Sequence, residues 1–308
     1  MSTLVTVLTL GFATGALYAL IALGYTMVYG IIELINFAHG DVFMVGAFIS
    51  LLMVQAIFGA TVSQFSGFGS VAAVLVALIV AMIGCGILGV VIERFAYRPL
   101  RNAPKLAPLV TAIGVSFILE NGVQVWQGGN THTYPNLLPT ATFVIGGTTV
   151  NSNIFVVIGV AVILMIVLDL FINRTRIGRA MRATAQDAEA AMMMGVDVNR
   201  VIAITFFVGS ALAGAAGVVY GIYINNIDWH IGFGAGLKAF TAAVLGGIGN
   251  IRGAMLGGLA IGLIESFVSQ LGGGGGIQWA DSAVFAVLIL VLVLKPTGLL
   301  GAQLVEKA

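Results

Sequence analysis

The distribution of basic residues constrains this chain more than any other feature of its sequence. Arg94 is the first Lys or Arg, and the residues before it are almost wholly apolar. Nine of the 13 basic residues then fall in two short clusters that lie between long apolar runs. One cluster comprises Arg94, Arg98, Arg101 and Lys105, and the other comprises Arg174, Arg176, Arg179, Arg182 and Arg200. This pattern predicts a chain that crosses a bilayer repeatedly, with both clusters on the cytoplasmic side.

The composition also favours a membrane protein and leaves little room for a soluble domain. Hydrophobic residues make up 59% of the 308 residues and charged residues only 8%, whereas about 25% of an ordinary soluble domain is charged. Each helical span needs about 20 apolar residues. We therefore expect an all-α, polytopic helical membrane protein with about eight to nine spans, including broken or re-entrant ones. These spans would form one transmembrane domain over residues 1–308.

Nine apolar runs are candidate spans, with boundary errors of about two to four residues. The run that starts at Leu4 has no basic segment before it and is long enough to span. We expect it to remain in the mature protein rather than to be a cleaved signal peptide. The candidate spans are residues 4–30, 41–58, 70–92, 106–127, 153–172, 199–224, 235–250, 253–271 and 279–294.

The basic clusters predict the sides on which the loops lie. If the loop at about 173–198 is cytoplasmic, the polar loop at about 128–152, which contains no Lys or Arg, is external. Alternation along the chain then puts 12 of the 13 basic residues on one side, with Lys238 as the exception. Nine spans would put the N-terminus outside. Eight would follow if residues 1–40 form a broken or re-entrant element.

Glycine accounts for 42 residues, many of them in strings of small residues. Small residues allow helices in lipid to approach closely, so tight packing is the simplest interpretation. A second interpretation applies to the pairs Gly246–Gly247 and Gly257–Gly258. These pairs would permit a broken or sliding helix beside a transport path.

The second basic loop contains the most informative polar segment. Thr184 to Asp187 looks like a capping box, so we expect a short helix from about Ala185 to Met194, with Gly195 as its C-terminal stop. Much of this helix is apolar, although it lies in a loop that should be exposed to water. It therefore either docks into a groove on a cytosolic protein or packs on the membrane or on its own bundle.

Isolated polar residues within the predicted spans are candidates for a translocation path. Polar groups inside a bilayer are costly, and they mark transport paths or structural contacts. Asn36, His39 and Asp41 either line such a path or form an interfacial turn in which Asp41 caps the next span. Glu120 and Glu265 either bond to a neighbouring helix or bind a coupling cation.

The sequence contains none of the motifs that would indicate catalysis or nucleotide binding by this chain. G-x-S-x-G, H-E-x-x-H and the Walker motif G-x-x-x-x-G-K-[ST] are all absent. His39, His132, His230 and Cys85 are scattered rather than spaced as metal ligands. We therefore expect no catalytic residue and no metal site. We also expect no nucleic-acid partner, because there is no basic patch interleaved with aromatic residues.

Several segments resemble one family of transporters. Residues 189–195 read Glu-Ala-Ala-Met-Met-Met-Gly, which resembles the EAA-x-x-x-G signature of permease subunits in bacterial ABC importers. The fuller signature continues to a Leu-Pro pair, whereas this chain has Thr205 to Val208 there, so the docking geometry of those relatives does not transfer. The stretches that are similar to the branched-chain amino acid permease family are residues 24–48, 92–101, 175–203 and 237–262.

The resemblance implies a subunit of an importer in the bacterial inner membrane. Its partners would be a second permease subunit that is a different homologous chain, two cytosolic ATPases that use ATP-Mg, and a periplasmic binding protein. This chain itself would bind no cofactor. The implied coupling residues in the cytoplasmic loop are Arg179, Arg182, Asp187, Glu189, Ala190, Ala191 and Gly195. The candidate path residues are Asn36, His39, Asp41, Glu120, Gly246 and Gly247.

The sequence is compatible with more than one substrate and more than one energy source. Branched-chain or similar aliphatic amino acids follow from the resemblance alone, and urea or short amides remain open. A different class is a secondary transporter driven by an ion gradient, in which Asp41, Glu120 or Glu265 is the coupling carboxylate.

Overall fold

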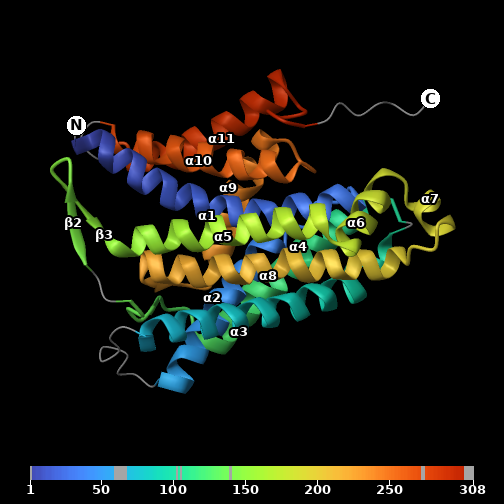
Figure 1. Cartoon of the computed structure of the whole chain (residues 1–308), viewed down its shortest axis with the longest axis horizontal. Helices are drawn as coiled ribbons and strands as arrows, with labels where there is room; N and C mark the ends of the chain where they lie inside the picture. The colour runs from blue at the N-terminus through green and yellow to red at the C-terminus, as the bar shows by residue number, and fades with distance from the viewer. Residues whose placement is uncertain are drawn as a thin grey trace.

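A computed structural model describes residues 2–58, 68–101, 103–104, 106–138, 141–271 and 275–301 of the chain. Two of the basic residues that we assigned to the cytoplasmic side, Lys105 and Lys307, lie outside these described residues. The described chain is a bundle of long helices with very little β-structure (Figure 1).

Eight helices of the described chain are long and apolar enough to cross a membrane, so the predicted polytopic helical fold is confirmed. A ninth apolar helix, α9 (Ile231–Gly246), has only 16 residues. At about 1.5 Å per residue it is shorter than a hydrocarbon core of about 30 Å. The eight long helices are α1 (Ser2–Ile32), α2 (His39–Phe58), α3 (Phe68–Ile92), α4 (Leu106–Gln127), α5 (Ser152–Arg174), α8 (Val198–Ile224), α10 (Ile251–Gln270) and α11 (Ile277–Leu294).

Eight long spans are found in the described chain, but the first of them is not the broken or re-entrant element that we considered as one alternative for residues 1–40. Residues 2–32 form one continuous helix, because nothing in this apolar run interrupts the backbone hydrogen bonds. The incomplete element is α9, which ends at Gly246. The short stretch of residues 33–38 joins α1 to α2, and it begins at Glu33 with a left-handed φ of 53°.

The polar loops lie at opposite ends of the bundle. The loop before α5 forms a hairpin of β2 (Thr142–Ile145) and β3 (Thr148–Asn151), which lies beside the N-terminus of α1 (Figure 1). A second strand pair, β1 (His132–Thr133) with β4 (Asn226–Ile227), joins the same loop to the end of α8. The helices α6 (Arg176–Gln186) and α7 (Ala188–Met193) lie at the other end (Figure 1).

Contacts bring the two basic clusters to the same end of the bundle. The π-helix η2 (Glu93–Tyr97) and the 3-10 helix η3 (Arg98–Leu100) continue α3 to Arg101. The Arg101 Nη1 donates to Asn199 Oδ1 at 2.6 Å, at the start of α8, and Arg101 also pairs with the buried Glu93. Arg252, at the start of α10, pairs with Asp169 in the last turns of α5 at 3.4 Å. Lys238 lies in the middle of α9.

Glycine allows α1 and α10 to pack with their backbones in contact. A Cβ added at Gly262 would lie 2.2 Å from the Gly15 nitrogen, and one added at Gly258 would lie 2.4 Å from the Ala19 nitrogen. Such close approach maximises dispersion contacts between helices in lipid. The Gly257–Gly258 pair therefore serves packing within a continuous helix, which is the simpler of our two interpretations for that pair.

Apolar side chains lie on the outside of the bundle as well as in its core. α8 is central, and its small residues pack against α2 and α3, as Gly214 does against Ala81. By contrast, α4 and α11 expose large apolar side chains, including Val125 (87% exposed) and Val293 (72%). A bilayer or a partner subunit would cover these side chains.

Candidate functional site

The predicted loop helix is two helices, and its predicted start at Ala185 is wrong. Thr184 to Gln186 form the last turn of α6, and the break is at Asp187, whose backbone is extended. The Asp187 carboxylate caps α7 by accepting hydrogen bonds from the Glu189 and Ala190 nitrogens, both at 3.0 Å. The N-terminal cap therefore lies three residues after the Thr184 that we expected, and α7 has only six residues.

The predicted stop at Gly195 is confirmed. Gly195 has a φ of +83°, which favours glycine. The Gly195 nitrogen donates to the Met192 carbonyl and the Val196 nitrogen donates to the Ala191 carbonyl, both at 3.0 Å. This left-handed termination turns the chain sharply from α7 back toward α8.

α6 anchors the loop to the end of α5. Arg182 Nη1 donates to the Ile172 carbonyl and, at 3.2 Å, to Asn173 Oδ1. Gly178 lies so close to the Ile172 carbonyl that an added Cβ would be 2.2 Å from its oxygen. Arg179 is exposed. The two predicted arginines therefore differ, since Arg182 holds the loop in place and Arg179 faces outward.

α7 exposes an apolar surface beyond the end of the bundle. Ala191 is buried, whereas Glu189 and Ala190 are exposed. Met193 is 88% exposed and Met194 is 84% exposed. Methionine is flexible and polarizable, and it is common on surfaces that bind partners. We call the exposed residues Glu189, Ala190 and Met192 to Met194 the α7 surface.

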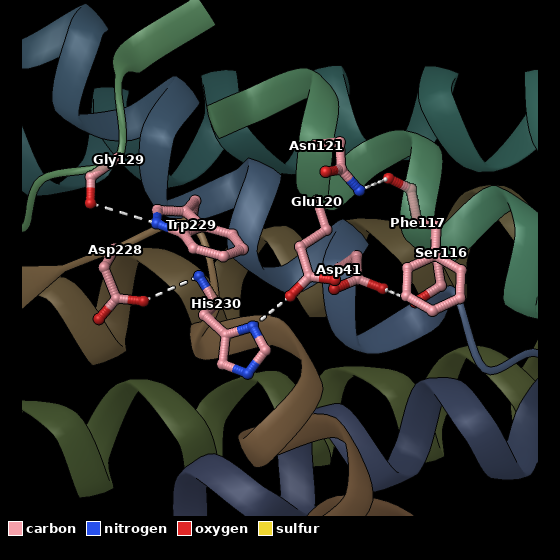
Figure 2. A network of polar contacts seen from close by, with 9 residues as sticks. All are labelled: Asp41, Ser116, Phe117, Glu120, Asn121, Gly129, Asp228, Trp229 and His230. Carbon is pink, nitrogen blue, oxygen red and sulfur yellow. Dashed lines mark hydrogen bonds and ion pairs between the residues drawn. The ribbon is translucent and has the colours of Figure 1, made fainter. Parts of the chain in front are cut away.

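Two of the predicted path residues, Asp41 and Glu120, belong to one polar network, although they lie on different helices (Figure 2). Asp41, in the first turn of α2, accepts a hydrogen bond from Ser116 of α4. Glu120, one turn further along α4, pairs with Nδ1 of His230. The Asp228 carboxylate accepts a hydrogen bond from the backbone nitrogen of His230 at 2.8 Å. The network thus joins α2 and α4 to the start of α9.

Asp41 does not have the capping position that we considered for it. α2 begins at His39, two residues earlier, so Asp41 lies within the first turn. Its side chain is directed to α4 (Figure 2).

The other predicted path residues lie apart from this network. Asn36 accepts a hydrogen bond from the Tyr97 hydroxyl at 3.0 Å, and the His39 ring packs against Tyr25 with centroids 4.8 Å apart. All of these side chains are buried. Gly246 ends α9, and its carbonyl accepts a hydrogen bond from the Leu300 nitrogen at 3.0 Å. Gly247 follows with a φ of +104°, so this pair does interrupt the helix.

A charged cavity was not among the predicted sites. It has a volume of about 340 Å³ and lies between α1, α2, α8, α9, α10 and α11. Lys238 Nζ lies 2.6 Å from Glu265 Oε1 and 2.6 Å from Asp281 Oδ1. Lys238 was the one basic residue that did not fit the positive-inside pattern, and that exception was the signal in the sequence. We call this space the outer cavity; its polar lining residues include Tyr18, Tyr220, Tyr223, Lys238, Glu265 and Asp281.

Within the ranges that the structure describes, no group of three or more His, Cys, Asp or Glu side chains is arranged to hold a metal ion. The described interior offers charged pairs, hydroxyls and apolar walls. These groups can bind and orient a small solute, which is the requirement of a transport path.

Comparison with known proteins identifies the family. A family model described as the branched-chain amino acid transport system permease component matches residues 7–294. The high-affinity branched-chain amino acid transport system permease protein BraD of Pseudomonas aeruginosa is 45% identical over 303 residues, covering 96% of this chain and 95% of BraD. LivH of Escherichia coli (strain K12), whose description is the same, is 44% identical over 305 residues, with 96% and 95% covered.

A more distant relative extends the match to an archaeon. The probable branched-chain amino acid transport permease protein LivH of Methanocaldococcus jannaschii is 26% identical over 302 residues, covering 93% of this chain and 89% of that protein. The match to the relatives in both bacteria and the archaeon spans nearly the whole transmembrane bundle rather than one loop. The chain therefore belongs to the permease family of branched-chain amino acid transport systems.

Proposed function

We propose that this chain is the permease subunit of an ATP-driven importer that carries branched-chain or similar neutral aliphatic amino acids into the bacterial cytoplasm. The observation that carries the proposal is the 45% and 44% identity, over nearly full length, to permeases of high-affinity branched-chain amino acid transport systems. Urea or short amides remain the alternative cargo for the same architecture.

The energy would come from partner proteins. The sequence has no Walker motif, so ATP and Mg²⁺ would be bound by two cytosolic ATPase subunits rather than by this chain. A second, homologous permease subunit would complete the membrane part, and a periplasmic binding protein would deliver the substrate. The assembly would lie in the inner membrane, with the α7 end of the bundle in the cytoplasm.

The α7 surface supports docking of an ATPase at that end. A six-residue helix that is capped by Asp187 and ended by Gly195 presents methionines more than 80% exposed, and Arg182 ties it to α5. Movement of a docked ATPase would therefore be transmitted to the span through α6. In this scheme ATP binding shifts the bundle between two conformations by favouring one of them.

A secondary transporter driven by an ion gradient is the second candidate. The observation in its favour is the pair of buried carboxylates, Asp41 and Glu120, in one network inside the bundle. We prefer the ATP-driven scheme because the α7 surface has no use in a transporter without a cytosolic partner.

Thiol labelling at Met193 tests the docking proposal. With Cys85 replaced by alanine, Met193→Cys provides a single thiol at a position that is 88% exposed. We expect a membrane-impermeant maleimide to label it in inside-out vesicles and not in right-side-out vesicles. Added ATPase subunits should slow this labelling, while Thr142→Cys, in the exposed hairpin at the other end, should show the opposite sidedness. Labelling of Met193→Cys from the periplasmic side alone would refute the proposal.

A further inference from the structure

The outer cavity lies toward the end of the bundle that is opposite α7. Its walls include Tyr223 and Ile224 in the last turn of α8 and Asp281 near the start of α11. The end of α8 and the start of α11 lie toward the end of the bundle that carries the β2–β3 hairpin (Figure 1). From there the cavity extends to Leu17 and Ile21 in the middle of α1.

Aromatic side chains pack on one another beyond the inner end of the cavity. Tyr25, one turn after Ile21, packs against Phe240 with ring centroids 6.1 Å apart and against His39 at 4.8 Å. Phe37 also packs against Phe240, with ring centroids 5.8 Å apart. This aromatic layer lies further toward the α7 end than the residues that line the cavity.

The charges in the cavity do not balance. Lys238 contributes one positive charge, while Glu265 and Asp281 contribute two negative charges, which leaves a net charge of −1 when all three are ionised. Lys238 and Glu265 have only 14% and 17% of their side chains exposed. Lys238 and Glu265 compensate each other, so the carboxylate left over is Asp281, whose side chain is 66% exposed and therefore accessible to a ligand that brings a positive group.

One buried oxygen of the Glu265 carboxylate, beside the cavity, has no hydrogen-bond donor in this conformation. Glu265 Oε2 is buried and has no hydrogen-bond partner among the residues that the structure describes, although Oε1 contacts Lys238 and the Tyr18 hydroxyl lies near the same carboxylate. A buried carboxylate oxygen without a donor is unusual in a native protein. If the Glu265 carboxylate turned toward the cavity, a primary ammonium bound there would supply the missing donor.

The rest of the lining fits the other parts of an amino acid. Lys238 offers a cation to a carboxylate, and the Tyr18 ring centroid lies 6.0 Å from its Nζ. Leu17, Ile21, Phe43 and Ile231 supply an apolar wall for an aliphatic side chain. The volume of about 340 Å³ is at the lower end of the range of about 300–1,000 Å³ for small-molecule pockets.

We propose that the outer cavity is a transient binding site for a free amino-acid zwitterion, with Glu265 and Asp281 facing its ammonium and Lys238 facing its carboxylate. This inference rests on the proposed function and deepens it, since it places the substrate within this chain. A zwitterion satisfies charges of both signs at once, which neither an amine nor a carboxylate alone can do. The site would hold the substrate after delivery and before the aromatic layer opens.

Protection of an engineered thiol tests this site. Gly234 lines the outer cavity, and a Cβ added there would meet nothing within 4 Å, so Gly234→Cys fits without strain. The variant is made with Cys85→Ala in the complete transporter, in phosphatidylcholine nanodiscs that contain no amine lipid. Labelling of this chain by a small methanethiosulfonate is followed by mass spectrometry. Leucine should lower the labelling rate by a factor of 1 + [L]/Kd, where [L] is the leucine concentration. This factor is about three when the leucine concentration is twice Kd.

Three comparisons separate the possible results. Isocaproate, which lacks the ammonium of leucine, and isoamylamine, which lacks the carboxylate, should each protect much less than leucine. Glu265→Gln, which preserves the shape of the side chain, should abolish protection by leucine. Thr142→Cys in the exposed hairpin should label at the same rate with and without leucine. Equal protection by isoamylamine and leucine would identify a simple cation site and overturn the proposal.

The failure of this site can be distinguished from the failure of the proposed function. If Gly234→Cys supports ATP-driven uptake of leucine while leucine leaves its labelling unchanged, the outer cavity is not a substrate site and the importer assignment stands. If the complete wild-type transporter shows no ATP-driven uptake of leucine, the proposed function itself is wrong.

Discussion

The double change Gly195→Val and Glu189→Lys is expected to lower ATP-driven uptake by at least about tenfold. A tenfold loss corresponds to about 1.4 kcal/mol of binding free energy, which changes at a docking surface commonly remove. Gly195 has a φ of +83°, a region that costs residues with a Cβ about 1–2 kcal/mol. Valine would therefore displace the end of α7. Lysine in the first turn also opposes the helix dipole, which favours an acidic residue there. Both changes alter the surface that the ATPase would contact while leaving the spans intact.

The chain offers a matched control for the backbone part of this change. Gly147, at the hairpin turn on the opposite end, has a φ of +82°, and a Cβ at either glycine would meet nothing within 4 Å. Gly147→Val thus imposes the same conformational strain far from α7 and should leave uptake close to wild type. Uptake and ATPase co-purification are measured in membranes that contain equal amounts of each variant. Normal values for the double variant would show that α7 does not couple ATP to transport.

Gly262→Val is expected to prevent the bundle from folding stably. The new Cβ would lie 2.2 Å from the Gly15 nitrogen and 2.3 Å from its Cα, so α1 and α10 would have to separate along their contact. Overpacking of a core costs about 1–3 kcal/mol when side chains can adjust, and backbone atoms adjust less readily. Since net stabilities are only about 5–15 kcal/mol, much of the protein should be lost as aggregate.

Gly159→Val is the control for this second change. Gly159 lies within α5, and a Cβ there would meet nothing within 4 Å. Size-exclusion chromatography in mild detergent and thermal unfolding should show Gly159→Val close to wild type and Gly262→Val depleted and less stable. Equal monodispersity and melting temperature for the two variants would mean that the α1–α10 contact is not as close as described.

The spans and the ends of the bundle were predictable because lipid imposes simple rules on sequence. An apolar run of about 20 residues without charge has few alternatives to a helix. The predicted runs 106–127 and 153–172 correspond to α4 and α5 within two residues at each end. Gly195 was also predictable, since a glycine directly after a short helix is a local signal.

The division of the loop at Asp187 was harder to predict. Thr184 to Gln186 suit the end of one helix as well as the start of the next, so local preference does not choose between them. The close contact of Gly178 with the Ile172 carbonyl and the hydrogen bond of Arg182 to the same carbonyl extend α6 up to Asp187. These are tertiary contacts, which a reading of local sequence does not contain.

The outer cavity could not be predicted for a different reason. Lys238, Glu265 and Asp281 come from three helices, and their spacing along the chain has no period that would bring them together. The helices are apolar on most of their surface, so the sequence pattern reveals where each helix runs but not which face it turns inward. Only the assembled bundle shows that these three charges meet at one cavity.

Reconstituted uptake tests the central claim most directly. Purified chain is placed in liposomes either alone or with its partner permease and two ATPases, and leucine-loaded binding protein is added outside. We predict that leucine accumulates only in the complete system and only with ATP and Mg²⁺ at the ATPase side, and that proton or sodium gradients drive no uptake by this chain alone. Accumulation of leucine by the chain alone, abolished when an ion gradient is collapsed, would contradict the account.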